Sequence, residues 1–170
     1  MFEVPQQPVF FDFVKTPFGV FRIGATQTGV ASIDFPRRWR VPKFRDKATR
    51  QVRGILKRTK DYLKYFSSRK SSPRNEPQID WHFFTSFEER ILRTLKKVPS
   101  GSVISYSALA KRAGIPRGAR AVGNALNRNP IPILIPCHRV IRKNQDLGGY
   151  RMGHHWKQKL LKLEGFEVKV

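Results

Sequence analysis

Alternating apolar and polar residues dominate the first third of the chain. The stretches VFFDFV (9–14), GVFRIGA (19–25) and GVASIDF (29–35) have the two-residue period of half-buried strands, with Pro and Gly at the turns between them. A three-stranded antiparallel meander is the simplest arrangement of such runs. The period then becomes helical between about Asp46 and Phe66. This pattern predicts a small sheet accompanied by one helix.

The predicted helix has one apolar face, and arginine and lysine occupy its other positions. The apolar residues are Ala48, Val52, Ile55, Leu56, Leu63 and Phe66. Residues 67–78, SSRKSSPRNEPQ, are polar, charged and interrupted by proline, which indicates a linker. We therefore place a domain boundary after residue 78.

From residue 79 to residue 170 the helical period dominates. In TSFEERILRTLKKV, a capping box is available from Thr85 with Glu88 or from Ser86 with Glu89. The apolar face expected for this helix comprises Phe87, Ile91, Leu92 and Leu95. This pattern predicts that the second domain begins with an amphipathic helix.

Two short helices joined by a glycine-containing turn are expected next. The first begins at Ser105 or Ser107, the turn covers 114–118, and the second runs from Ala119 to Asn127 before Asn129 and Pro130 stop it. Two helices so close together are typical of a helix-turn-helix.

The C-terminal part is expected to contain three further elements. These are a short strand at 139–143, a glycine-rich hairpin at 146–153 and a final helix. The residues of this helix that we expect to point inward are Trp156, Leu160, Leu161 and Leu163.

The charge balance indicates a polyanionic partner. The 170 residues include 34 Lys and Arg against 12 Asp and Glu, a formal net charge of +22. Such an excess adds self-repulsion and favours nucleic acid as the partner, ahead of an anionic membrane. No apolar run approaches the roughly 20 residues of a spanning helix, and no secretory signal is visible. We expect a soluble, cytoplasmic or nucleoid-associated protein with no membrane partner.

Cysteine and histidine residues restrict the chemistry further. A single cysteine excludes an internal disulfide framework and is compatible with a reducing compartment. The candidate metal ligands are Cys137, His82, His138, His154 and His155, and their spacing is not that of a structural zinc site. We therefore expect neither a metal nor a cofactor.

Cations gather around the predicted helix-turn-helix, at Lys111, Arg112, Arg117, Arg120 and Arg128. By pattern alone, two packed helices without DNA would be equally compatible, and the charge favours DNA. The second helix, ARAVGNALN, is rich in small residues and carries one long cationic side chain near its start. This composition suits a close approach to DNA by shape or through the minor groove better than reading of major-groove bases.

The stretch IPILIPCHRVI, residues 131–141, leaves the role of Cys137 open. Burial statistics favour an inert core thiol, whereas His138 and Arg139 would favour a thiolate electrostatically. Neighbours on an extended segment point to opposite faces, so His138 would act through a bridging water, or another group would be the base. Glu164 is either the residue that orients a histidine or a solvated charge at a helix end.

Several stretches together resemble the O6-alkylguanine-DNA alkyltransferase family, also called methylated-DNA–protein-cysteine methyltransferases. They are GSVISYSALA, RAVGNALNRNP, IPCHRV, GGYRMG and LLKLEG, all in order within residues 85–165. The first 80 residues match only in outline. The resemblance implies an α+β fold: a small N-terminal RNase H-like domain with a three-stranded antiparallel sheet and a helix (1–78), and a mostly helical, winged helix-turn-helix-like domain (79–170).

The resemblance also implies an activity. Family members flip an alkylated guanine out of double-stranded DNA and transfer its alkyl group irreversibly to a cysteine, so each molecule acts once. By position, Cys137 would be the acceptor, His138 a water-mediated base and Glu164 the residue that orients His138. We expect O6-methylguanine as the chief substrate and a monomeric protein.

Other roles are carried over by position. Arg120 resembles the arginine that enters the minor groove and fills the gap left by the flipped base. Tyr106 resembles the tyrosine that crowds the 3′ phosphate and donates to the departing guanine. The further DNA contacts expected on this basis are Ala119, Ala121, Gly123 and Arg128.

The substrate pocket follows from the same resemblance. Asn129 would brace the turn beneath the cysteine, and Tyr150 would form a pocket wall. The main chains of Cys137, Val140 and Arg151 would read the guanine edge. Relatives with open pockets carry small residues after this tyrosine, whereas this chain has Arg151 and Met152. This difference predicts a narrower pocket that accepts methyl groups more readily than benzyl groups.

Other classes of protein remain as alternatives. A non-catalytic lesion binder would lack the cysteine, and a helix-turn-helix regulator would bring a dimer interface, for which we find no pattern. A Cys-His hydrolase would not explain the net charge of +22. For the first domain, we expect a bracing role and phosphate contacts through Arg37, Arg38, Arg40 and Lys43, with a solvated basic face as the alternative.

Overall fold

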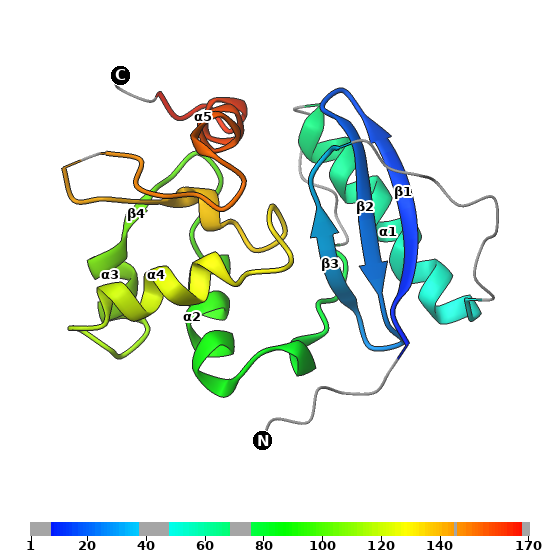
Figure 1. Ribbon diagram of the computed structural model, residues 1–170, viewed down its shortest axis with the longest axis horizontal. Coiled ribbons are helices and arrows are strands. Elements are labelled where there is room, and N and C mark those ends of the chain that lie inside the picture. Colours follow the sequence, from blue (N-terminus) through cyan, green and yellow to red (C-terminus); the bar gives the residue numbers. More distant parts are fainter. Residues whose placement is uncertain (1–7, 38–47, 69–75, 145, 168–170) are drawn as a thin grey trace. The chain divides into compact units, whose positions relative to one another are not determined.

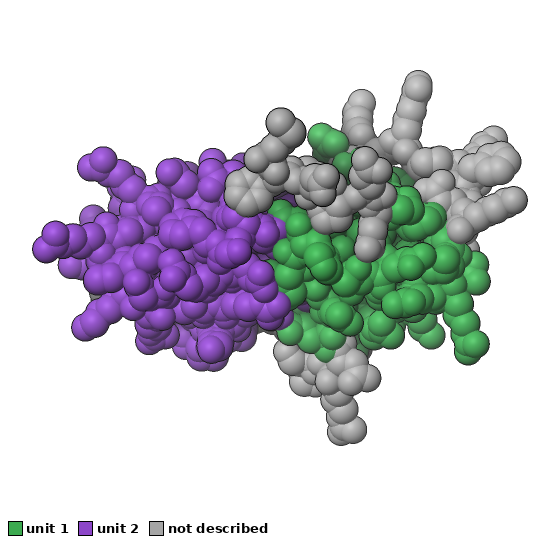
Figure 2. All heavy atoms as spheres, turned by 90° about the horizontal axis from the view of Figure 1, so that it is seen from below, with its two compact units in different colours: residues 1–83 green, residues 84–170 purple. Residues whose placement is uncertain are grey.

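The computed structural model describes residues 8–37, 48–68, 76–144 and 146–167. The chain divides into two compact units, residues 1–83 and 84–170, which Figure 2 colours separately. The first unit contains a three-stranded sheet and a long helix, and the second is mainly helical, as Figure 1 shows. The fold is therefore α+β, as predicted.

The predicted meander is confirmed. Strands β1 (Phe10–Thr16), β2 (Gly19–Ala25) and β3 (Val30–Asp34) form an antiparallel sheet in the order β1-β2-β3. Alternate residues of these strands, including Phe21 and Ile23, are buried on one face. The tight turn between β1 and β2 requires a positive φ of 113° at Gly19, which favours glycine there.

Helix α1 (Arg50–Ser67) packs on the sheet (Figure 1). Thr49 caps it, since its side chain accepts a hydrogen bond from the Val52 amide at 3.3 Å. Five of the six predicted apolar residues are buried, namely Ala48 just before the helix and Val52, Ile55, Leu56 and Leu63 within it, whereas Phe66 is half-buried. The predicted start at Asp46 lies outside the described residues, as do the predicted phosphate contacts Arg38, Arg40 and Lys43.

The first unit extends to Phe83, a few residues beyond the predicted boundary after residue 78. Ile79 forms a parallel bridge with Val30 at the edge of the sheet. The buried Asp80 carboxylate then accepts a hydrogen bond from the Thr26 hydroxyl at 2.5 Å. These contacts explain the difference, because they attach the end of the expected linker to the sheet.

Helix α2 (Ser86–Lys96) begins the second unit after the short 3₁₀ helix η1 (Trp81–Phe83). Of the two predicted capping boxes, Thr85 with Glu88 is the one that forms. Ile91, Leu92 and Leu95 are buried as expected, but the prediction for Phe87 is wrong, because its side chain is 37% exposed. In the first turn of α2 the buried side chain is that of the next residue, Glu88, instead of Phe87.

The predicted helix pair is confirmed in its bounds. Ser105 caps helix α3 (Tyr106–Arg112), and helix α4 (Ala119–Asn127) follows a short turn. Strand β4 (Ile104–Ser105) pairs in parallel with strand β5 (Val140–Ile141), with Ile104 opposite Val140. This pairing connects the start of α3 to the segment that contains the cysteine.

The glycine-rich segment 146–153 differs from its prediction. Its described residues form a loop rather than a strand hairpin. Asp146 explains this, because its side chain accepts the Gly148 amide at 2.6 Å and its carbonyl accepts the Arg142 amide at 2.8 Å. These bonds replace a regular strand ladder.

Helix α5 (His154–Leu163) completes the second unit. Leu160 and Leu161 are fully buried, whereas Trp156 and Leu163 are half-buried. In the part of the chain that the structure describes, no helix combines the length and apolar character needed to cross a bilayer.

Candidate active site

A short 3₁₀ helix, η2 (Cys137–Arg139), holds the cysteine. The sequence analysis treated this segment as extended. The chain instead turns directly after Pro136. The Cys137 amide donates to the Ile135 carbonyl at 2.8 Å, and the Arg139 amide donates to the Pro136 carbonyl at 2.9 Å. These local bonds explain the difference, since they satisfy the backbone without a partner strand.

Asn129 fixes the loop that leads to Cys137. Its side-chain amide donates to the Ile135 carbonyl at 3.0 Å and to Cys137 Sγ at 3.3 Å. Its oxygen accepts the Ile131 amide at 3.0 Å. Asn129 thus lies beneath the cysteine loop, where it was expected, and donates a hydrogen bond that favours a negatively charged sulfur.

Ile133, in the same loop, has a left-handed backbone with a φ of 74°. A β-branched residue rarely adopts this conformation, which costs about 1–3 kcal/mol and requires support from its surroundings. Ile133 is almost completely buried, and the hydrogen bonds of Asn129 surround it in sequence. The packing of the loop therefore holds a strained turn four residues before Cys137.

His138 and Glu164 lie together in the interior, behind Cys137. The His138 Nε2 atom is 3.1 Å from Glu164 Oε1, and both side chains are almost fully buried. Arg139 binds the same carboxylate in a bidentate manner, at 2.9 Å from Nε and 2.7 Å from Nη2. Its Nη1 donates to the Val98 carbonyl at 2.5 Å. Glu164 is therefore a buried anion with two partners and not a solvated helix end.

The charges of this cluster follow from its contacts. Burial alone would raise the pKa of Glu164, but hydrogen bonds from His138 and Arg139 lower it to about 2. Burial lowers the pKa of His138, against the opposing effect of Glu164, which favours a neutral ring. With Nε2 directed to the carboxylate, the ring proton belongs on Nε2, and Nδ1 is the basic nitrogen.

Lys157 is a buried cation that the sequence analysis did not identify. From α5, its Nζ donates to the Val140 carbonyl at 2.5 Å and to the Leu147 carbonyl. Burial lowers its pKa to about 8, while Cys137 acts in the opposite direction. Burial raises the pKa of the Cys137 thiol, and Asn129 and Lys157 both counteract this effect. Lys157 therefore supplies a positive charge that favours the thiolate.

We expect Lys157→Gln to raise the pKa of the Cys137 thiol, because the amide keeps hydrogen-bond donors but removes the charge that counteracts burial. Since the chain has one cysteine, the ultraviolet absorbance of the thiolate reports Cys137 alone. Lys159→Gln, at an exposed position of the same helix, is the matched control and should leave the titration unchanged. Identical titrations of both variants would show that Lys157 acts only through its hydrogen bonds.

Cys137 lines a pocket of about 660 Å³ in the second unit. This volume is typical of a site for a small organic group. Residues from α4 and from the loop after β5 form the walls. The predicted site residues that line it are Tyr106, Ala119, Arg120, Gly123, Asn129, Cys137, Tyr150, Arg151 and Met152. The sequence analysis missed Asn124, Leu126, Asn127, Pro132, Arg142 and Gly149 in the same lining.

Two tyrosines flank the sulfur in this pocket. The Tyr106 hydroxyl donates to the Gly149 carbonyl at 3.4 Å, which joins the start of α3 to the glycine-rich loop. Burial, and next the proximity of Cys137, raise the pKa of Tyr106 and raise that of Tyr150 well above its usual range. Both side chains are therefore neutral hydroxyls that can donate hydrogen bonds.

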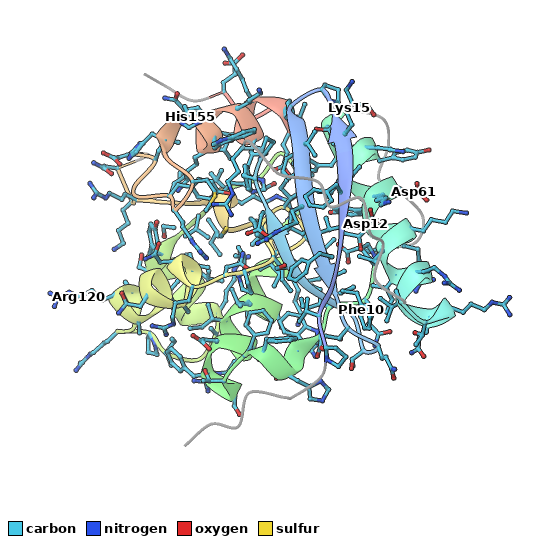
Figure 3. The ribbon with its side chains drawn as sticks, turned by 45° about the vertical axis from the view of Figure 1, so that its right-hand side comes forward. Phe10, Asp12, Lys15, Asp61, Arg120 and His155 are labelled. Carbon is cyan, nitrogen blue, oxygen red and sulfur yellow. The ribbon has the colours of Figure 1, made fainter. Side chains whose placement is uncertain are left out.

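Some predicted site residues lie outside this lining. Val140 is buried in β5, and its carbonyl accepts Lys157 Nζ. Ala121 is half-buried on α4. Arg128 Nε pairs with Glu88 Oε1 at 2.7 Å, although its side chain is still 63% exposed. In contrast, Arg120 projects outward from the start of α4, as Figure 3 shows.

Comparisons with known proteins give this geometry its context. A profile described as 6-O-methylguanine DNA methyltransferase, DNA binding domain, matches residues 86–166. The methylated-DNA–protein-cysteine methyltransferase of Methanosarcina barkeri is 33% identical over 166 residues, which cover 92% of this chain and 97% of that protein. The chain belongs to the methylated-DNA–protein-cysteine methyltransferase family.

Other relatives match over a shorter part of the chain or at lower identity. The Methanosarcina acetivorans protein of the same name is 49% identical over 81 residues, covering 48% of this chain and 52% of that protein. The matched region thus spans about half the length of this relative. The crystal structure of Mycobacterium tuberculosis OGT in complex with DNA is similar over 91% of both chains, with 28% identity and a TM-score of 0.72.

The O6-methylguanine-DNA methyltransferase structure from Pyrococcus kodakaraensis is similar over 93% of this chain and 99% of that chain, with 28% identity and a TM-score of 0.59. The family expected from the sequence is therefore confirmed. All residues that line the 660 Å³ pocket fall within the part of the chain that the methyltransferase DNA-binding profile covers.

Proposed function

We propose that this member of the methylated-DNA–protein-cysteine methyltransferase family repairs DNA by direct reversal of alkylation. It takes O6-alkylguanine, chiefly O6-methylguanine, from duplex DNA into the pocket and transfers the alkyl group to Cys137. One observation carries this proposal. Cys137 lines a pocket together with the exposed Arg120, and His138, in the turn that holds Cys137, pairs with the buried Glu164 at the end of α5.

Deprotonation of Cys137 would begin the reaction. The thiol proton passes through a bridging water to Nδ1 of His138, whose other nitrogen faces Glu164. The thiolate is stabilised by the Asn129 amide and by the charge of Lys157. A thiolate is required because it is the soft nucleophile that attacks a saturated carbon readily.

In the transfer step, Cys137 Sγ forms a bond to the alkyl carbon while the bond from that carbon to guanine O6 breaks. The electron pair of the broken bond stays on the guanine, which takes up a proton and becomes an ordinary base. The Tyr106 hydroxyl, at the edge of the pocket, donates a hydrogen bond to the departing guanine. The product is a thioether that water does not cleave, so each protein molecule acts once.

DNA binding would use α4 and its flanking cations. Small residues such as Ala119 and Gly123 allow the helix to approach the minor groove closely. Arg120 then occupies the space of the extruded nucleotide. Extrusion costs a few kcal/mol and is easiest for a poorly paired lesion, which adds selectivity before the chemical step. We propose that the protein does this as a monomer.

The intact mass of the protein after incubation with a duplex containing one O6-methylguanine tests this function. We expect a gain of one methylene unit (about 14 Da), located on the peptide of Cys137 and limited to one per molecule. An unmodified duplex is the control and should give no gain. Tight binding of the lesion without any mass gain would overturn the proposal in favour of a non-catalytic lesion binder.

The pocket should discriminate against bulky adducts. Arg151 and Met152 both line it, so we expect benzyl lesions to react at least about tenfold more slowly than methyl lesions. The double substitution Arg151→Ser and Met152→Gly should accelerate the benzyl reaction and leave the methyl reaction nearly unchanged. Single-turnover rates on the two lesions provide the comparison. Equal rates in the unaltered protein would contradict a narrow pocket.

A further inference from the structure

A second pocket lies in the first unit, between β1 and α1. Its volume is about 230 Å³, which is below the range of sites for drug-sized ligands and suited to one flat ring system. Figure 3 shows Phe10 and Asp12 on β1, with α1 beside this strand. The side chains that matter here are Phe10, Asp12, Arg53, Leu56, Lys57 and Lys60.

One wall of this pocket is apolar. Phe10 and Asp12 point to the same face of β1, and Asp12 pairs with Lys60 of α1, so this is the face that meets the helix. Phe10 is only half-buried there, next to the buried Leu56. A partly exposed aromatic ring beside an aliphatic side chain is a surface on which a nucleobase can stack.

The pocket lining also contains the cations Arg53, Lys57 and Lys60 of α1. Asp12 brings little negative charge, because Lys60 pairs with one carboxylate oxygen and the Phe13 amide donates to the other at 2.8 Å. Arg53 and Lys57 are exposed and have no ion pair with any carboxylate of the described residues. The pocket therefore combines an aromatic wall with two cations that lack an anionic partner in the described chain.

These cations continue along the helix. Arg53, Lys57, Lys60 and Lys64 follow one another at intervals of three or four residues, which places them on one face of α1. The resulting basic stripe extends over about 16 Å of the helix. Asp61 is the only acidic residue of α1. A stripe of this kind matches a chain of regularly spaced negative charges.

We propose that the first unit binds an unpaired nucleic-acid strand, with one base in the 230 Å³ pocket against Phe10 and the adjacent phosphates along the basic stripe. A single strand fits better than a duplex, because its bases are unstacked and one of them can enter the pocket. Neither the pocket nor the stripe belongs to the alkyl-transfer site. This second site does not depend on the proposed repair activity.

Photo-crosslinking of the full chain to a short oligothymidine that contains 5-iodouracil tests the location of the base. We expect an adduct on the peptide of Phe10. The double substitution Arg53→Gln and Lys57→Gln should reduce this adduct at least about fivefold, since it removes two phosphate contacts. The control is Lys15→Gln with Arg58→Gln, which removes the same charge from exposed positions of the same unit outside the pocket lining.

The salt dependence of oligothymidine binding gives a second readout. Loss of two phosphate contacts should make the slope of log K against log salt less steep by about 1.4, while the control keeps the original slope. Methyl transfer from a short duplex should be equal in both double variants, which separates this proposal from the repair function. Adducts confined to residues 84–170, or equal losses in both double variants, would overturn it.

Discussion

Replacing Cys137 with serine is expected to abolish methyl transfer and to leave binding of a methylated duplex nearly unchanged. Serine occupies almost the same volume, so the loop fixed by Asn129 should persist. The hydroxyl, however, ionises far less readily than a thiol, and neither the Asn129 amide nor Lys157 can compensate for that. We expect the rate to fall by at least roughly 10⁴-fold, as when a nucleophile is removed from an enzyme.

Single-turnover transfer and duplex binding by fluorescence anisotropy together check this expectation. Cys137→Ala serves as the comparison, because it removes the sulfur and any replacement hydroxyl entirely and should bind the lesion as well as the serine variant does. If Cys137→Ser still acquired a methyl group on any side chain, Cys137 would not be the acceptor.

Glu164→Gln is expected to have the second-largest effect, on both activity and stability. The carboxylate partners His138 and two nitrogens of Arg139, all in the interior. A neutral amide would leave the Arg139 charge without its anion and would no longer hold the tautomer of His138. His138 would then be a poorer base for the thiol. We expect methyl transfer to slow by about 10²–10³-fold, which is the usual size of a general-base contribution.

The stability of Glu164→Gln should depend on pH differently from that of the unaltered protein. The folded-state pKa of Glu164 is about 2, below its ordinary value of 4.5, so the stabilisation it brings is complete above pH 4.5. That stabilisation, of order 3 kcal/mol, is lost as the pH falls from 4.5 to about 2. The variant lacks this part of the acid transition.

Urea unfolding at neutral and acidic pH measures this difference. Glu89→Gln is the matched control, because Glu89 pairs with Arg93 at 2.7 Å in a far more exposed position. Such surface pairs contribute at most about 1 kcal/mol. If Glu164→Gln retained the same loss of stability towards low pH as the unaltered protein, another group would be responsible for it.

Local sequence patterns predict much of the fold correctly. The three strands follow from two-residue periodicity, and the bounds of α4 follow from the turn before it and from Asn129-Pro130 after it. The capping box at Thr85 and Glu88 is a short-range hydrogen-bond pattern and is visible in the sequence. These features depend on neighbours within a few residues, so sequence alone specifies them.

Contacts between distant segments explain what sequence reasoning missed. The bidentate bond between Arg139 and Glu164 joins residues 25 positions apart, and no periodicity indicates it. Lys157 did carry a signal, since it lies three and four positions before the buried Leu160 and Leu161 and hence on the inner face of α5. The sequence analysis did not include Lys157 on that face, and lysine is seldom fully buried.

The two-residue pairing of β4 with β5 has a consequence for how this site tolerates change. Ser105 in β4 immediately precedes Tyr106, and Val140 in β5 follows the 3₁₀ turn of Cys137. The pairing therefore fixes the separation between Tyr106 and Cys137. This separation does not depend on the conformation of residues 107–136 between them. Insertions in the turn before α4 would alter how the helix meets its ligand but would preserve the alignment of Tyr106 with Cys137. A change of length in that turn would therefore act on the position of α4 alone and leave the spacing of Tyr106 and Cys137 unchanged.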